Sequence, residues 1–333
     1  MSLLTAKPKQ KRLEWVDIAK GIAILLMVIG HEVKNMHIYA LIFSFHMPLF
    51  FILSGYTSSR VNNWNKFIYK QKKSFKRIWL LAVLMVFLLG LENLALLSNF
   101  TLQEFGPSLI KGIYWGSNVP VLGVMSVGVM WFMFVFFWSK FLFDLLQVLL
   151  PDIYSGLILF VLSGLSMIWC QNFAHFLPQA LDIVPIAALF MWIGTFIKES
   201  VDFDNLTGLN KLVFTGLIII WAGCFICKIY IELSTRHYPG LYLPIFEAVG
   251  GTFVVAFFAK LLPSGKVSEF FQTVGKHTLA VLCIHHLDLY WVIWGDYIQS
   301  WPVAVIVRLI VDLVLLALVI YWQHWFAKRK KSI

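Results

Sequence analysis

Residues 14–34 read EWVDIAKGIAILLMVIGHEVK, an apolar stretch long enough to cross a membrane that nevertheless contains Asp17, Lys20 and His31. A second apolar stretch follows at once, and its residues 45–56 read FHMPLFFILSGY, with another imidazole near the start. Ionisable side chains are expensive at the depth of a bilayer, where they persist when they line a bundle interior or a polar cavity. The two stretches therefore predict a pair of transmembrane helices that carries a functional site.

The composition agrees with a membrane protein. The 333 residues are 60% hydrophobic and only 13% charged, with a mean hydropathy of +0.80. A soluble domain of ordinary composition has about a quarter of its residues charged. Because a helix needs roughly 20 apolar residues to cross the hydrocarbon, the chain has room for about ten such helices. We expect an all-α membrane protein whose residues 1–333 form a single membrane-embedded domain.

The basic residues predict how the helices are oriented. We expect about ten transmembrane helices, at residues 14–34, 39–59, 78–97, 122–145, 153–170, 179–197, 211–231, 243–262, 277–295 and 302–326. Lys and Arg gather in every second connection, whereas the opposite side has only three, Lys34, Lys111 and Arg236. The positive-inside rule then places both termini in the cytoplasm, with residues 1–13 and 327–333 as basic ends. Basic residues spread between apolar segments do not form a nucleic-acid site.

Asp17, Lys20 and His31 fall on one stripe of the first helix. At 100° per residue they lie within about 60° of one another, and Lys20 and His31 are roughly 16 Å apart along the axis. Asp17 precedes Lys20 by three residues, so the two can pair and lower the cost of burying both. The stripe suits a long ligand with an anionic head and a reactive tail, a shape that coenzyme A (CoA) esters have.

Each of these residues also has an ordinary structural interpretation. Asp17 and Lys20 could be an interfacial ion pair, and His31 could be a core histidine with satisfied nitrogens. A buried neutral imidazole such as His46 needs a partner, and it can serve as a general base or as a hydrogen-bond donor. Three polar residues on one stripe, next to the His46 segment, favour the functional interpretation.

Other polar features are expected to be structural. Arg308 and Asp312 are four residues apart and should pair on one helix. Arg236 lies in an expected outer loop, where a surface position is the default and a contact to a phosphate of the substrate is the alternative. The longest outer connection, at about residues 98–121, is either rich in interfacial aromatic residues or folds over the bundle.

The sequence resembles a known family. Residues 12–23, which read RLEWVDIAKGIA, together with His31 and residues 45–56, resemble the acyltransferase 3 family of integral membrane O-acyltransferases, in particular its fucose 4-O-acetylase-like branch. The resemblance continues, more loosely, at residues 72–78, 130–132, 192–194 and 274–279, and at His285. It thus extends over nearly the whole chain.

The resemblance implies a catalytic centre in the first two helices. The family pattern of a basic residue, ten further residues and a histidine matches Lys20 and His31, which makes His31 the expected catalytic histidine. From their positions in the two helices we also assign Lys20, Asp17 and His46 to this centre, where Lys20 and Asp17 would fix the donor channel. The family often has arginine where this chain has Lys20, and lysine keeps the charge without the planar guanidinium fork.

The resemblance also implies how the substrates bind. The basic segment with Lys73, Lys76 and Arg77 would hold the phosphates of the donor, acetyl-CoA or another acyl-CoA. Trp131 and His285 would contact the substrate. We expect no metal ion to be required.

We therefore expect a multi-pass O-acetyltransferase of a bacterial cell membrane, which acetylates a hydroxyl of an envelope glycan or of a lipid-linked sugar. His31 would act either as general base or as a transient carrier of the acyl group. The alternative is a non-enzymatic translocator of a glycan or lipid, in which the same polar stripe lines the pathway.

Overall fold

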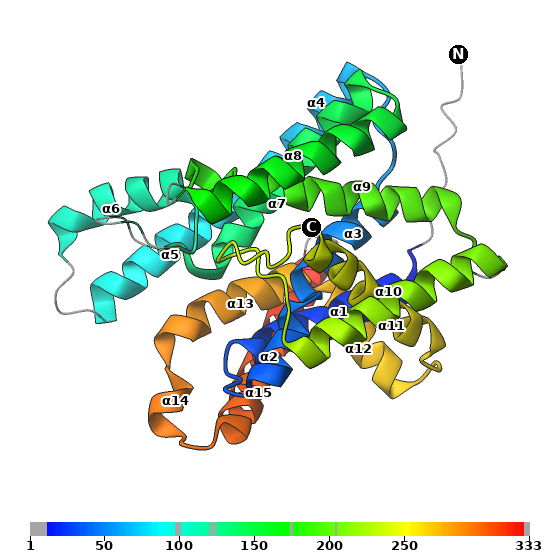
Figure 1. The fold of residues 1–333 in the computed structure, drawn as a ribbon. Coiled ribbons are helices and arrows are strands. Elements are labelled where there is room, and N and C mark those ends of the chain that lie inside the picture. The colour runs from blue at the N-terminus through cyan, green and yellow to red at the C-terminus, as the bar shows by residue number, and fades with distance from the viewer. Residues whose placement is uncertain are drawn as a thin grey trace, which may run out of the picture.

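The computed structural model describes residues 12–96, 101–119, 121, 124, 126–173, 176–203 and 205–329. Most of the two expected basic ends, at residues 1–11 and 330–333, lies outside the described residues. The described part is built from helices (Figure 1). They are α1 (Glu14–Gly30), α2 (Met36–Phe43), α3 (His46–Thr57), α4 (Trp64–Ser74), α5 (Leu80–Leu96), α6 (Leu102–Trp115), α7 (Trp131–Leu149), α8 (Asp152–Asn172), α9 (Val184–Ser200), α10 (Gly208–Cys227), α11 (Leu243–Leu261), α12 (Lys266–Lys276), α13 (Thr278–Trp291), α14 (Trp294–Tyr297) and α15 (Trp301–Arg329).

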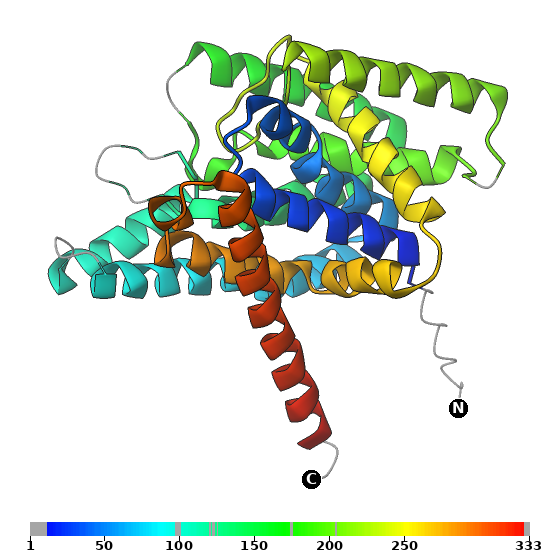
Figure 2. The same ribbon diagram turned by 90° about the horizontal axis from the view of Figure 1, so that it is seen from below.

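The expected fold class, an all-α membrane protein, is confirmed. Among the described residues, eight helical segments are long and apolar enough to cross a membrane. The remaining two of the ten expected segments correspond to α1, with 17 residues, and α13, with 14. The first half of α15 packs on the bundle, whereas its second half projects away from the other helices (Figure 2).

The second expected helix is divided in two. α2 ends at Phe43 and α3 begins at His46, because Phe45 between them has non-helical backbone angles, with φ −142° and ψ −21°. Pro48 lies in the first turn of α3, where a missing backbone N–H leaves no hydrogen bond unmade. The break places His46 at the start of a helix in the middle of the bundle.

The expected outer connection at residues 98–121 contains a helix instead of a long loop. α6 occupies 14 residues of it, and Glu104 accepts hydrogen bonds from the backbone N–H and the hydroxyl of Thr101, at 3.0 and 2.9 Å. This reciprocal cap fixes where the helix starts. α6 lies beside α5, so the two form a hairpin at the edge of the bundle (Figure 1).

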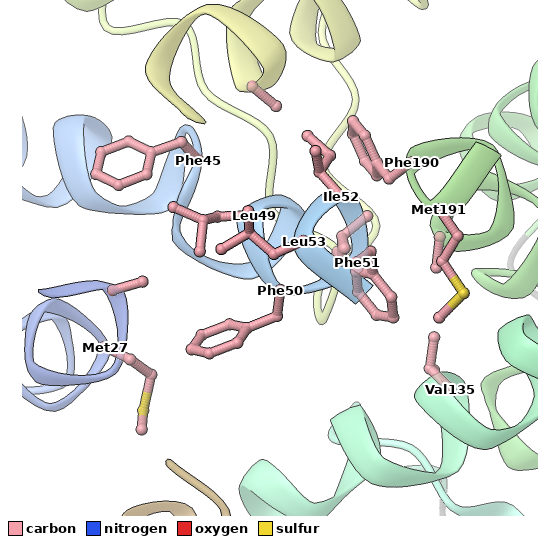
Figure 3. Close-up of a cluster of buried hydrophobic side chains, with 14 of the residues drawn as sticks. Met27, Phe45, Leu49, Phe50, Phe51, Ile52, Leu53, Val135, Phe190 and Met191 are labelled. Atoms are coloured by element: carbon pink, nitrogen blue, oxygen red, sulfur yellow. The ribbon is translucent and has the colours of Figure 1, made fainter. Parts of the chain in front are cut away.

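α3 is the centre of the apolar core. Figure 3 shows Phe50 directed toward Met27 of α1, while Phe51 lies on the side of Val135 of α7 and Met191 of α9. All five side chains are less than a tenth exposed. Burying an aromatic or aliphatic side chain of this size contributes roughly 1.5–3 kcal/mol in water. In a bilayer, where lipid tails are as apolar as leucine, close packing supplies more of the stabilisation.

Two pairs of glycines bring helices into backbone contact. A Cβ atom on Gly194 of α9 would lie 1.9 Å from the carbonyl oxygen of Ile52 in α3, and one on Gly55 of α3 would lie 1.8 Å from that of Met191. Gly21 of α1 and Gly275 of α12 make the same kind of approach. Small residues at helix contacts are typical of membrane bundles. These contacts hold α3 and α1 where they can line a common space.

We expect Gly194→Ala to destabilise the fold by about 1–3 kcal/mol, because the added methyl group meets backbone that cannot rotate away. Gly216→Ala is the matched control, since this glycine lies inside α10 with no atom within 4 Å of an added Cβ. Thermal unfolding of the detergent-purified variants measures the difference. Equal melting temperatures for the two variants would contradict close α3–α9 packing.

Candidate functional site

Two cavities adjoin inside the bundle at Met27, Met47 and Leu282, which line both of them. The first, here called the imidazole cavity, has a volume of about 300 Å³, and its polar and aromatic lining includes His31, Tyr39, Phe43, His46, Asn118, Trp131, Glu232 and Ser234. The second, here called the lysine cavity, has a volume of about 370 Å³, and its lining includes Arg12, Lys20, Phe50, Ser54, Thr57, Arg77, Phe132, Phe136 and Lys276. Basic side chains therefore gather in one cavity and imidazoles in the other.

One face of α1 runs along both cavities. Lys20 lines the lysine cavity, Met27 lies at the junction, and His31 lines the imidazole cavity. The helical rise of 1.5 Å per residue separates Lys20 from His31 by roughly 16 Å. The sequence placed His31 inside the first helix, but it lies just after Gly30, the last residue of α1. The helix end exposes the imidazole to the cavity.

Phe43 lies next to both imidazoles of the cavity. Its ring centroid is 6.4 Å from that of His31 and 4.8 Å from that of His46, in edge-on geometry in both cases. Tyr39 stacks on the same ring at 3.9 Å. α2 thus supplies an aromatic wall against which the two histidines are held.

The hydrogen bond of His46 determines its tautomer. Its Nδ1 lies 2.8 Å from the carbonyl oxygen of Ile42, and the side chain is only 2% exposed. A carbonyl can only accept, so Nδ1 carries the proton, and Nε2 of the neutral ring is left as an acceptor. His46 can therefore accept a hydrogen bond from a hydroxyl in the cavity.

A carboxylate faces the imidazole cavity from the loop between α10 and α11. Glu232 accepts hydrogen bonds from the hydroxyl of Tyr39 at 3.0 Å and from the hydroxyl of Ser234 at 2.9 Å. All three residues line the cavity. Their oxygen atoms and the aromatic wall give the cavity a combination of apolar faces and a few placed polar groups, which is common in small-molecule sites.

The loop that carries Glu232 is anchored by Arg236. The expectation of a surface position for Arg236 is wrong, because the residue is 5% exposed and its Nε donates to Asp182 at 2.7 Å. It also donates to the hydroxyl of Ser117 at 2.8 Å and to the carbonyl of Ser234 at 2.7 Å. A bidentate guanidinium–carboxylate contact satisfies both charges and fixes the loop.

The expected pair of Asp17 and Lys20 is replaced by another. Asp17 accepts two hydrogen bonds from the guanidinium of Arg12, at 2.5 and 2.9 Å, and its side chain is 3% exposed. Arg12 precedes α1, so its long side chain can fold back onto the first helical turn. Because Asp17 pairs with Arg12, Lys20 does not have Asp17 as its closest partner, and it lines the lysine cavity.

The structure separates the three basic residues expected to hold the donor. Arg77 lines the lysine cavity, whereas Lys73 and Lys76 are exposed and do not line it. Arg77 belongs to a π-helical turn, Phe75–Trp79. Lys276, the last residue of α12, lines the cavity too.

Of the two residues expected to contact the substrate, Trp131 faces the imidazole cavity and His285 lies behind its wall. Trp131, the first residue of α7, lines the imidazole cavity. His285 on α13 is fully buried and does not line it, contrary to the expected substrate contact. The ring of His285 is instead 5.1 Å from that of His31, and its Nδ1 is 3.3 Å from Oδ2 of Asp312.

A buried charge cluster surrounds Arg308 behind this pair. The expected ion pair of Arg308 with Asp312 is not the closest contact, because Arg308 lies 3.0 Å from Glu32 and 3.2 Å from Asp288. The side chain of Arg308 is 1% exposed. The cluster joins Arg308 of α15 to Asp288 of α13 and to Glu32 in the turn after α1. The i, i+4 spacing of Arg308 and Asp312 on α15 could not indicate these contacts between elements.

His285, Asp288 and Asp312 are the residues whose arrangement most resembles a metal site. Their ligand atoms lie within 4.8 Å of one another. The guanidinium of Arg308 already faces Asp288 at 3.2 Å, and it would repel a divalent cation placed in the cluster. These three side chains therefore surround a guanidinium, and we assign no metal ion to them.

Comparison with known proteins gives one match. A family model described as "Acyltransferase domain" matches residues 13–322, which is nearly the whole chain. No curated protein and no solved structure matches the chain.

Proposed function

Since the chain belongs to the acyltransferase 3 family, and is thus a membrane acyltransferase, we propose that it transfers an acetyl group from acetyl-CoA to a hydroxyl of a sugar. The observation that carries this proposal is the adjoining pair of cavities, with basic residues lining one and imidazoles lining the other. The narrower resemblance to the fucose 4-O-acetylase-like branch stays a prediction.

The lysine cavity suits the donor. Arg12, Lys20, Arg77 and Lys276 line it, and cationic side chains bind phosphate groups by charge-assisted hydrogen bonds. Aromatic and aliphatic side chains continue from these cations to the junction with the imidazole cavity. A slender pantetheine arm that follows them would bring the thioester to the junction.

The imidazole cavity suits the acceptor. Tyr39, Phe43 and Trp131 offer aromatic faces, and Glu232 and Asn118 offer polar atoms. A sugar ring has apolar faces and hydroxyl edges, so this lining matches its chemistry. The acceptor in this proposal is an envelope glycan or a lipid-linked sugar.

His31 is the residue placed to perform the transfer. As general base it would take the proton from the sugar hydroxyl while the hydroxyl oxygen attacks the thioester carbonyl carbon. The C–S bond then breaks, the new ester leaves, and His31 returns the proton to the sulfur of CoA. His46, with Nε2 as an acceptor, would accept a hydrogen bond from a neighbouring hydroxyl of the sugar and so orient the ring. Transient acylation of His31 is the alternative mechanism.

The distribution of basic residues supports an assignment of the membrane side from which each substrate enters. The positive-inside rule favours cytoplasmic termini, and it places the beginning of α1, with Lys20, toward the cytoplasm. The donor would enter from there, and the acceptor would meet His31 from the opposite side of a bacterial cell membrane. A translocator would also need a path through the bundle, but membership of an acyltransferase family favours the enzyme.

Deleting the protein should remove acetyl groups from an envelope glycan. Mass spectrometry of glycans from cells with and without the protein should show a difference of one acetyl group per modified residue. Identical glycan masses, with the protein present in the membrane of the comparison cells, would contradict the proposed acceptor class. The result also identifies the acceptor for the assays below.

His31→Ala should lower the rate of acetyl transfer by about 10²–10⁴-fold, the usual contribution of a positioned general base. His37→Ala is the matched control, because His37 is exposed on the neighbouring helix α2 and does not line the imidazole cavity. Free CoA released by the purified proteins in the presence of the acceptor glycan measures the rate. Wild-type turnover in His31→Ala would reject the assigned role.

Arg77→Gln combined with Lys276→Gln should weaken CoA binding, because both cations line the lysine cavity. Lys73→Gln combined with Lys76→Gln is the control, with the same change in charge at exposed positions outside the lining. Calorimetry at low salt should show a loss of about tenfold or more for the first pair, and the difference should shrink at high salt. An equal loss for both pairs would mean that diffuse charge, and not the cavity, attracts the donor.

A further inference from the structure

A second imidazole stands directly behind His31. α1 contacts both α13 and α15, and this contact brings His285 to His31 with 5.1 Å between the ring centroids and 38° between the ring planes. His285 is 0% exposed and is absent from the lining of both cavities. The imidazole cavity thus has an inner residue that can touch His31 but cannot touch a substrate held in that cavity.

Asp312 determines which nitrogen of His285 is free. Oδ2 of Asp312 lies 3.3 Å from Nδ1 of His285, and the carboxylate is 2% exposed. When Asp312 is ionised, its carboxylate can only accept, and Nδ1 then carries the proton while Nε2 of the neutral ring is an acceptor. Within the described part of the chain, that Nε2 is buried and has no hydrogen-bond partner. A buried imidazole nitrogen without a partner is costly, and this one belongs to the ring that lies 5.1 Å from the ring of His31.

The surroundings of His285 are rich in negative charge. Glu32, Asp288 and Asp312 bring three carboxyl groups to one guanidinium, that of Arg308, which pairs with Glu32 at 3.0 Å and Asp288 at 3.2 Å. Arg308 also donates to the carbonyl of Val292 at 3.0 Å. The guanidinium is thus shared among several oxygen atoms, and Asp312 is the carboxyl group in hydrogen-bond contact with His285.

We propose that His285 and Asp312 are positioning residues that orient His31 and stabilise the charge it acquires during transfer; this rests on the proposed function. His31 accepts the proton of the sugar hydroxyl on the side of the cavity and becomes an imidazolium. The Nε2 lone pair of His285 then accepts a hydrogen bond from the other nitrogen of His31, and Asp312 balances the charge. The proton goes from His31 to the sulfur of CoA, so His285 and Asp312 exchange no proton with the substrates.

The arrangement follows the logic by which a carboxylate orients a catalytic histidine in hydrolases, with one more imidazole inserted. In those enzymes, replacing the carboxylate by an amide keeps the shape of the site but costs about 10⁴-fold in kcat, because the wrong tautomer results. An amide at position 312 would likewise offer an N–H to Nδ1 of His285. His285 would then present an N–H to His31 in place of a lone pair.

Asp312→Asn and His285→Asn should each lower kcat by about 10²–10⁴-fold while the KM for acetyl-CoA changes by less than about threefold. Asp312→Glu should recover part of the lost kcat, because it restores the carboxylate. His286→Asn is the matched control, since the adjacent histidine is equally buried at 0% exposure but points to another face of α13. The assay follows free CoA released from acetyl-CoA with the isolated envelope glycan as acceptor.

The outcomes separate this inference from the proposed function. If the wild-type protein transfers and His31→Ala does not, but Asp312→Asn keeps wild-type kcat, the positioning role is wrong while the function stands. A raised KM with unchanged kcat would show a binding role and would also overturn it. Equal losses in His285→Asn and His286→Asn would point to packing alone. Thermal unfolding accompanies every variant, and His285→Gln replaces any variant that does not fold.

Discussion

An ionisable side chain at the depth of a bilayer must meet an opposite charge or a polar cavity, and this constraint organises the whole molecule. Most buried charges in the described residues satisfy it in pairs, such as Asp17 with Arg12 and Asp182 with Arg236. Lys20 satisfies it differently, because its side chain lines a cavity. Lys20 belongs to neither of these ion pairs, so its charge is available to a substrate in that cavity.

The cavities depend on how closely the helices approach one another. Glycine contacts bring α3 onto α9 and α1 onto α12, and these positions let α1 and α3 face each other across Met27 and Met47. The break before His46 then turns the start of α3 toward the end of α1. A continuous second helix would carry His46 in a helix interior, where its Nδ1 and Nε2 would meet different neighbours.

Much of the fold was predictable because the length of each apolar segment is a property of the sequence. The stripe with Lys20 and His31 was also predictable, since helical periodicity alone places the two residues on one face. The ion-pair partners of the buried charged residues were not predictable. Asp17 selects Arg12 from outside its helix, and Arg236 turns inward to Asp182. Such choices depend on the reach of side chains between elements, which spacing along one helix does not encode.

In the proposed reaction, donor and acceptor reach His31 from opposite sides of the membrane. Sealed proteoliposomes test it most directly, with the acceptor glycan trapped inside, acetyl-CoA added outside, and the protein sorted by the side on which its C-terminal tail is cut by protease. Vesicles with the tail outside should acetylate the trapped glycan, whereas vesicles with the tail inside should not. Transfer only when donor and acceptor share one side would contradict the account.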